Sequence, residues 1–261
     1  PVDNLPPARN YVDEFVFAKL KTVGMPPSEI CDDSTFIRRV SIDIGGRLPT
    51  PEETKAFLAD KDGNKRDKLI DRLLASTDYA NFFANKWSSL LRNKRTKSSY
   101  QRGNYAFHAW VRDSLHQNKP YDQFVKEHLA GDSMGADLGT GFLVAGPYDI
   151  VKSPDPNLTL TQRQDELADM INTTGTAFLG LTIGCARCHN HKVDPVTQRD
   201  YYSMQAIFAG VRFGERAVQR KVNEAGKKEL ESLRVSLASV ERELNQLRAL
   251  AAKNEGAPSA R

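Results

Sequence analysis

The sequence contains little cysteine and histidine, and it lacks long apolar runs. Only three cysteines and five histidines occur in 261 residues. A disulfide-stapled secreted domain normally carries an even set of cysteines in a shorter chain, so that class is disfavoured. Cys31, far from the other two, is expected to be a small buried apolar residue. Since no apolar run approaches the roughly 20 residues of a membrane-spanning helix, we expect no transmembrane segment.

The sequence also lacks the marks of a targeting segment and of a nucleic-acid site. Its first residues, PVDNLPPARN, have no apolar stretch of the signal-peptide kind, and the chain begins without Met. We therefore expect a piece of a longer protein. Net charge is +4, and the densest basic run is RNKRTKSS at 92–99. Because it lacks interleaved aromatic residues for base stacking, we interpret it as a solvated loop and expect no nucleic-acid partner.

Helical periodicity dominates, and no strand pattern persists long enough to build a sheet. The sequence predicts an all-α domain over residues 8–213. Its expected helices include one ending at Gly24, one capped by Asp33 or Ser34, and one with a Thr50–Glu53 capping box. DSMGADLGTGF (132–142) is expected to be a loop. A long helix over 161–181 leads into a cysteine motif, and another follows with Pro195 near its first turn.

The C-terminal part differs in pattern. Leucine and valine recur at alternating spacings of three and four residues, which is a heptad stripe of about two and a half heptads. We expect an amphipathic helical arm over 214–252 and a flexible tail or linker over 253–261. The arm could pack on its own domain, form a hairpin, or bind a partner helix through 230–247. The stripe comprises Leu230, Leu233, Leu237, Val240, Leu244 and Leu247.

The segment GLTIGCARCHNHKVDP (180–195) holds the main chemical signal. Within it, Cys185, Cys188 and His189 form C-x-x-C-H, the attachment sequence of c-type haem. Residues i and i+3 project from the same side of a helical turn, so both thiols could bond one porphyrin. His189 would then be the proximal ligand of the iron. We expect one covalent haem c, and hence a cytochrome c-like haem domain over residues 8–213.

Two other interpretations of the motif remain. Cys185, Cys188, His189 and His191 could be zinc ligands, although four ligands within seven residues rarely complete a tetrahedron without a second arm. A redox disulfide is the other alternative, but it is typical of a βαβ context, whereas the surroundings here are helical.

Further candidates surround the motif. His191, Arg187 and Lys192 could contact haem propionates or orient the proximal ligand, because carboxylates beside an apolar porphyrin need charge compensation. No residue stands out as the distal ligand, and an open sixth position is an alternative. Weak distal candidates are Met134, Met170, His108 and His128.

Long phrases of the chain resemble a known family, the cytochrome c-type domain of unknown function found in planctomycetes. The resemblance runs from about residue 12 to 211 and is carried by FIRRVSIDIGGRLPTPEE (36–53), YDQFVKEHLAGD (121–132) and INTTGTAFLGLTIGCARCHNHKVDP (171–195). It implies haem attachment at Cys185, Cys188 and His189, and it makes His191 and Asp194 better candidates. Asn190 stands where the family usually has Asp.

The resemblance also implies export to the periplasm or an equivalent compartment, and a downstream domain in the same protein. The sequence supports three functional hypotheses. The first is a redox module that transfers electrons to the downstream domain or a periplasmic partner. The second is a haem c enzyme with an open iron site, a peroxidase or oxidase that could act on carbohydrate. The third is a zinc-stabilised structural or binding domain.

Overall fold

The computed structural model describes residues 2, 5–93, 101–144, 153–214 and 224–255. Within these residues every regular element is helical, which confirms the predicted all-α class. The chain divides into two compact units, Pro1–Glu215 and Arg216–Arg261. Most of the basic run predicted as a solvated loop, and the end of the predicted tail, lie outside the described residues.

The N-terminal helices begin and end at residues suited to those positions. Gly24, with φ of 69°, ends the first helix as predicted. Thr50 and Glu53 form the predicted capping box, with Pro51 at the first helical position. The predicted cap of the second helix was wrong by one residue, because the Asp32 carboxylate accepts the Thr35 amide. The helices are α1 (Tyr11–Val23), α2 (Asp33–Gly45), α3 (Pro51–Ala59) and α4 (Lys65–Leu74).

Helices α2, α3 and α4 share a small apolar core made by Ile37, Phe57, Leu69 and Leu73. Ion pairs between charged side chains stabilise the edge of this core. The Arg47 guanidinium bonds Glu53 at 2.8 Å and Asp78 at 2.6 Å.

The pKa of Glu53 falls to about 2, chiefly because of the hydrogen bond from Arg47 and then because of the Thr50 amide. Arg47 therefore ties α3 to the first turn of α5 (Thr77–Leu90).

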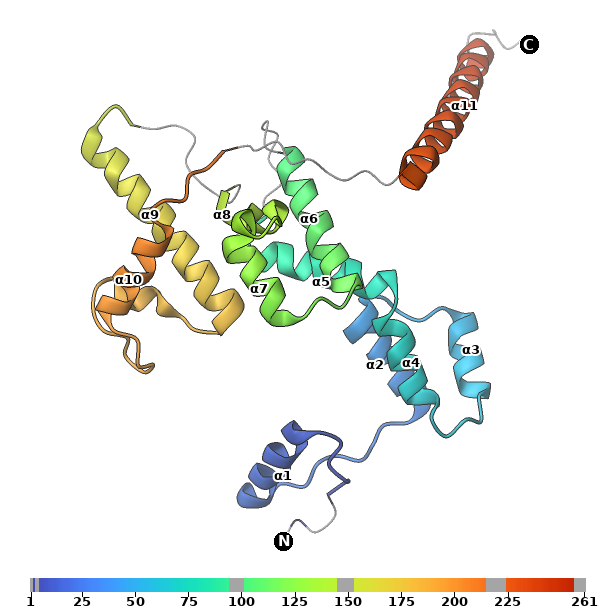
Figure 1. Cartoon of the computed structure of the whole chain (residues 1–261). Helices are drawn as coiled ribbons and strands as arrows, with labels where there is room; N and C mark the ends of the chain where they lie inside the picture. The colour runs from blue at the N-terminus through green and yellow to red at the C-terminus, as the bar shows by residue number, and fades with distance from the viewer. Residues whose placement is uncertain (1, 3–4, 94–100, 145–152, 215–223, 256–261) are drawn as a thin grey trace. The chain divides into compact units, whose positions relative to one another are not determined.

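The central helices are α5, α6 (Gln101–His116) and α7 (Tyr121–Ala130). Helices α5 and α6 pack along each other (Figure 1). The segment predicted as a loop at 132–142 instead forms tight 3₁₀ turns and enters the short helix α8 (Gly141–Val144). Gly139 permits this, because a Cβ there would lie 2.6 Å from the Glu127 carbonyl oxygen.

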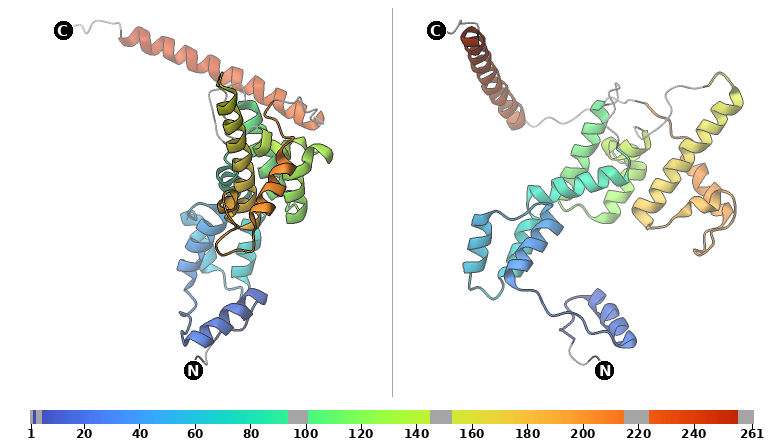
Figure 2. Two further views of the ribbon diagram at one scale, coloured as in Figure 1. Left: turned by 90° about the vertical axis from the view of Figure 1, so that its left-hand side faces the viewer. Right: turned by 180° about the vertical axis from the view of Figure 1, so that it is seen from behind.

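Helices α9 (Pro156–Thr174) and α10 (Gln198–Phe208) carry the cysteine motif between them and pack against each other (Figure 2). They join α5 to α8 around one larger core, rich in aromatic side chains. Pro195 lies three residues before α10 and outside its first turn, because Thr197 provides the cap. Buried aromatic members of this core are Phe107, Phe124, Phe142, Tyr201 and Phe208.

The second unit contains α11 (Glu224–Glu255), 32 residues long. This helix spans most of the predicted arm and continues into the segment predicted as a flexible tail. Of the helices that the structure describes, none has both the length and the apolar character needed to cross a bilayer.

Candidate functional site

Two tight turns lead the chain from α9 into the cysteine motif. A π-helical turn over Gly175–Leu179 ends at Gly180, whose φ of 66° favours glycine. A 3₁₀ turn then spans Ile183–Arg187. Cys185 lies within this turn and Cys188 is its C-cap residue. The Cys188 amide donates to the Cys185 carbonyl at 3.3 Å, which closes the turn.

Within the motif, buried apolar residues alternate with exposed cysteines. Ile183 and Ala186 are buried and belong to the larger core. Cys185 and Cys188 are exposed and have free thiols. The turn is therefore anchored by its apolar residues while both sulfur atoms remain accessible.

The backbone orients the His189 imidazole. Its Nδ1 lies 2.7 Å from the Asn190 carbonyl oxygen. Because a carbonyl oxygen can only accept, Nδ1 carries the proton and Nε2 carries a lone pair. His189 is exposed. It therefore offers an unprotonated ring nitrogen beside two accessible thiols, and such a backbone contact is the usual way to fix a metal-binding histidine.

The loop after the motif is organised by His191 and Asn190. His191 Nδ1 accepts the amide of Asp194 at 2.8 Å, so this nitrogen carries no proton and its 3.4 Å approach to the Asp194 carboxylate is not an ion pair. The Asn190 side chain accepts the amide of Gln198 at 2.9 Å and so satisfies the first amide of α10, beside the Thr197 cap. Only Nε2 of His191 therefore remains for a hydrogen bond to a propionate or to a group that orients His189.

Arg187 is held by neighbouring helices. Its guanidinium donates to Asp165 of α9 at 2.9 Å, and this bond raises the pKa of Arg187. Its carbonyl accepts from Gln198 at 3.2 Å and from the Tyr202 hydroxyl at 3.1 Å. Sequence reasoning missed these three partners, and only their helical placement near the motif could have suggested them.

Arg187 is thus shared with Asp165, whereas Lys192 is exposed. Their assignment as propionate partners stays a prediction.

A buried hydroxyl group lies close to the motif. Tyr201 on α10 is 1% exposed, and its hydroxyl has no hydrogen-bond partner within the described residues. Burial raises the pKa of this phenol, and the Arg187 charge acts against that rise. An unsatisfied buried hydroxyl is costly, which makes Tyr201 a candidate donor to a polar group bound at the motif.

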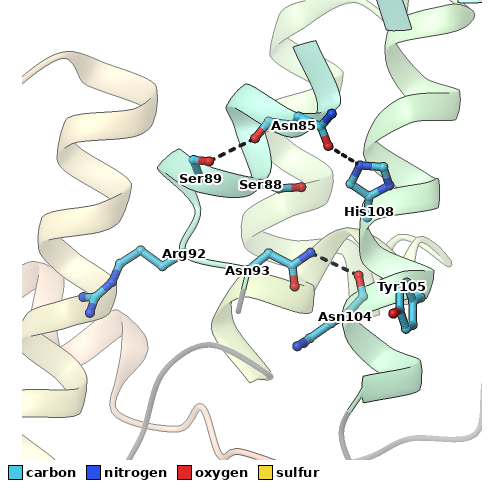
Figure 3. A pocket seen from close by; sticks show the side chains of 8 residues that line it. All are labelled: Asn85, Ser88, Ser89, Arg92, Asn93, Asn104, Tyr105 and His108. Atoms are coloured by element: carbon cyan, nitrogen blue, oxygen red, sulfur yellow. Dashed lines mark hydrogen bonds between the residues drawn. The ribbon is translucent and has the colours of Figure 1, made fainter. Parts of the chain in front are cut away.

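The weak distal candidates lie in different surroundings. Met170 is in the core with 4% of its surface exposed, whereas Met134 is 45% exposed after a 3₁₀ turn. His108 faces a polar cleft of about 480 Å³ between α5 and α6 and bonds the Asn85 side chain at 3.1 Å (Figure 3). No residue of the cysteine motif lines this cleft. The structure gives no geometric reason to prefer any of the three as a ligand.

The fourth candidate, His128 on α7, is fully buried. Its Nδ1 lies 2.8 Å from the Phe124 carbonyl oxygen, so Nδ1 donates and Nε2 carries a lone pair. Nε2 has no partner in the described parts of the chain. Six aromatic rings, here called the aromatic cage, surround the imidazole with centroids 4.2–6.5 Å away: Trp87, Phe107, Trp110, Phe124, Phe142 and Phe178.

The aromatic cage keeps His128 uncharged. Burial lowers its pKa to about 4, mainly because the cage cannot solvate an imidazolium. Phe178 belongs to the turn that precedes the cysteine motif, and its carbonyl accepts from the Tyr121 hydroxyl at 3.2 Å. His128 thus lies where α5 to α8 meet the segment that carries the motif. With no exposed surface, it does not present Nε2 to a group attached at accessible thiols.

The side chains fit haem attachment better than zinc binding. No three His, Cys, Asp or Glu side chains converge as a metal site in the described ranges. A structural zinc site needs about four such ligands. Haem requires less of the protein, because the porphyrin itself provides four nitrogen ligands and thioethers hold the ring. The two accessible thiols and the His189 tautomer meet that smaller requirement.

Comparison with known proteins places the chain in one family. The model of PSCyt2, a protein of unknown function (DUF1549), matches residues 11–213. Searches of curated proteins and of solved structures find no match. The family match covers the whole cysteine motif and stops before α11.

Proposed function

The chain belongs to the PSCyt2 family, and we propose that it is a c-type cytochrome domain that binds one haem c and transfers electrons. The observation that carries this proposal is the arrangement at residues 183–190. Two exposed thiols lie on one 3₁₀ turn anchored by buried Ile183 and Ala186. Beside them, Nδ1 of His189 donates to the Asn190 carbonyl, which leaves the lone pair on Nε2 for a metal.

Each residue has a defined part in this proposal. Cys185 and Cys188 would form the thioethers, and His189 would be the proximal ligand. Arg187 and Lys192 would balance propionate charge. Bound haem would supply one-electron redox chemistry. The protein would supply attachment, the fixed imidazole tautomer and the local charge.

Export is part of the same proposal. Thioether attachment of haem c takes place outside the cytoplasm in bacteria, as the family resemblance implied. A periplasmic or equivalent compartment and a redox partner there, or a further domain of the same protein, follow from it. The absence of a candidate membrane span among the described helices is compatible with this placement.

A haem enzyme is the second candidate function. His128 and Met170 are buried, so neither presents a ligand atom to a group attached at the accessible thiols. Without another ligand, the iron would keep an exchangeable position. Spectral change on addition of CO or cyanide would support this candidate, and an unchanged low-spin spectrum would support electron transfer alone.

The cysteines allow a controlled test. We would co-express the full chain with a cytochrome c maturation system and measure its intact mass after denaturation. The proposal predicts a mass increase of one haem that survives denaturation. Cys185→Ser and Cys188→Ser should each remove one thioether, and the double variant should carry no covalent haem. Cys31→Ser is the matched control and should match the wild type. Equal haem loss in all three single variants, or no haem in the wild type, would contradict the proposal.

A further inference from the structure

Helix α11 carries one apolar stripe with no counterpart among the described residues of its own unit. The stripe side chains Leu230, Leu233, Leu237, Val240, Leu244 and Leu247 are between 45% and 64% exposed. An isolated helix cannot bury one face against itself. A stripe of this length is therefore expected to have a partner surface.

The spacing of the stripe fits a two-helix seam. Steps of three and then four residues place Leu230, Leu237 and Leu244 at heptad position a. Leu233, Val240 and Leu247 then occupy position d. The outward positions b, c and f are mostly polar, as expected of a helix that contacts a partner along one narrow face: Glu231, Ser232, Ser239, Arg242, Asn245 and Gln246.

The charges beside the seam indicate which partner it fits. Positions g hold Glu229, Ser236 and Glu243, and positions e hold Arg234, Glu241 and Arg248, so that Glu241 would face the neutral Ser236 in a parallel pair. In a parallel pair of helices, each g residue faces the e residue five positions later on the other helix. A second copy of α11 would thus pair Glu229 with Arg234 and Glu243 with Arg248, twice each by symmetry. We infer that α11 binds α11 of a second copy of this chain as a parallel coiled coil.

An antiparallel arrangement of two α11 helices would form fewer contacts between opposite charges. It brings position e next to e and position g next to g. With all six apolar layers in register, it pairs Arg234 with Glu241, while Glu229 and Glu243 gain no opposite charge from the other residues whose side chains are described. Counted over both helices, parallel pairing therefore makes four favourable charge contacts and antiparallel pairing makes two.

This inference does not rest on the proposed haem function. Helix α11 lies outside the residues that match PSCyt2 and in a separate compact unit from the cysteine motif. Association can be measured on the full chain without haem, so failure of one proposal leaves the other intact.

Charge reversal provides a specific test by sedimentation equilibrium of the full chain over a wide concentration range. The wild type should approach twice the 29.2 kDa of one chain. Arg234→Glu with Arg248→Glu places like charges across the seam and should raise the dissociation constant by about tenfold or more. Glu229→Arg with Glu243→Arg should do the same. An equimolar mixture of the two variants restores every cross-seam pair and should recover the wild-type mass.

The control reverses a charge away from the seam. Arg242→Glu at position f should leave the dissociation constant unchanged, and circular dichroism should show equal helix content in all variants. A wild type that stays at the mass of one chain would overturn the inference. So would equal weakening by Arg242→Glu, or a mixture that fails to recover, because the latter would mean that the helices are not parallel.

Discussion

The cysteine motif and the aromatic cage hold two histidines in the same tautomer but in opposite surroundings. His189 Nδ1 donates to the Asn190 carbonyl at 2.7 Å, and His128 Nδ1 donates to the Phe124 carbonyl at 2.8 Å. Both imidazoles therefore have an Nε2 lone pair. That of His189 lies on an exposed residue beside two thiols, whereas that of His128 is sealed among six aromatic rings.

The difference shows that tautomer alone does not make a ligand. A metal ligand needs an accessible lone pair and a way to bring the metal to it. In the proposed haem site the motif would provide both, because the thiols would fix the porphyrin next to His189. The aromatic cage provides neither, so His128 is expected to act on stability and not on haem binding. Each prediction below tests one side of this contrast.

The largest expected effect is on haem binding when the two histidines are substituted separately. After co-expression with a maturation system, His189→Ala should lose most of its covalent haem and its characteristic reduced spectrum, because the proximal ligand is gone. His128→Phe should retain both in whatever folded protein is recovered. Absorption spectra normalised to folded protein would measure this. Loss of the spectrum in His128→Phe at full haem content would mean that His128 is a ligand, and the contrast would fail.

The second prediction concerns the pH dependence of stability. The folded pKa of His128 is about 4, against an ordinary value of 6.5. Between these values the unfolded chain binds the extra proton, so stability is fully present above about pH 6.5 and falls as pH falls toward 4. The shift corresponds to about 3 kcal/mol of unfolding free energy.

Urea unfolding of the haem-free chain at several pH values between 4 and 7 would measure this. His128→Phe or His128→Gln should flatten the curve relative to the wild type, and the wild type minus variant difference removes the contribution of carboxylates. A variant with an unchanged slope would show that His128 titrates normally and that the aromatic cage is open to water.

A smaller effect is expected from the loop that follows the motif. Asn190→Ala removes the acceptor for the Gln198 amide at the start of α10 and should cost about 1 kcal/mol of unfolding free energy. Asn190→Asp keeps an acceptor and adds a charge that suits a helix N-terminus, so it should be neutral or slightly stabilising. Thermal unfolding of the two variants would test this, and equal losses would show that the bond is not the cause.

The smallest effect is expected at Tyr201. Because its buried hydroxyl has no partner in the described residues, Tyr201→Phe should leave the haem-free chain as stable as the wild type or up to about 1 kcal/mol more stable. With haem bound, the same change should shift the midpoint potential if the hydroxyl donates to the group. A clear loss of stability without haem would show that the hydroxyl already has a protein partner.

The sequence predicted helices well where periodicity and caps coincide. The capping box of Thr50 and Glu53 and the helix end at Gly24 were both predicted, because each depends only on residues within one helical turn. It failed over 132–142, where Gly139 permits close packing against α7 and turns a predicted loop into 3₁₀ turns. The close approach of Gly139 to α7 is a tertiary contact, and a local sequence pattern does not predict such contacts.

The candidate site follows the same rule. Cys185, Cys188 and His189 lie within five consecutive residues, so their spacing alone was enough to predict them. The bond between Arg187 and Asp165 and the burial of Tyr201 depend on how α9 and α10 pack, which local sequence patterns do not record. The aromatic cage was also hidden, because its six rings come from five segments that only folding brings around His128.

The most direct test of the central claim is a pyridine haemochrome assay on the matured full chain, with its visible spectrum recorded oxidised and then reduced by dithionite. The account predicts a Soret band, sharp reduced α and β bands of haem c, and one haem per chain. Absence of a Soret band, in cells where a control cytochrome c matures normally, would contradict it.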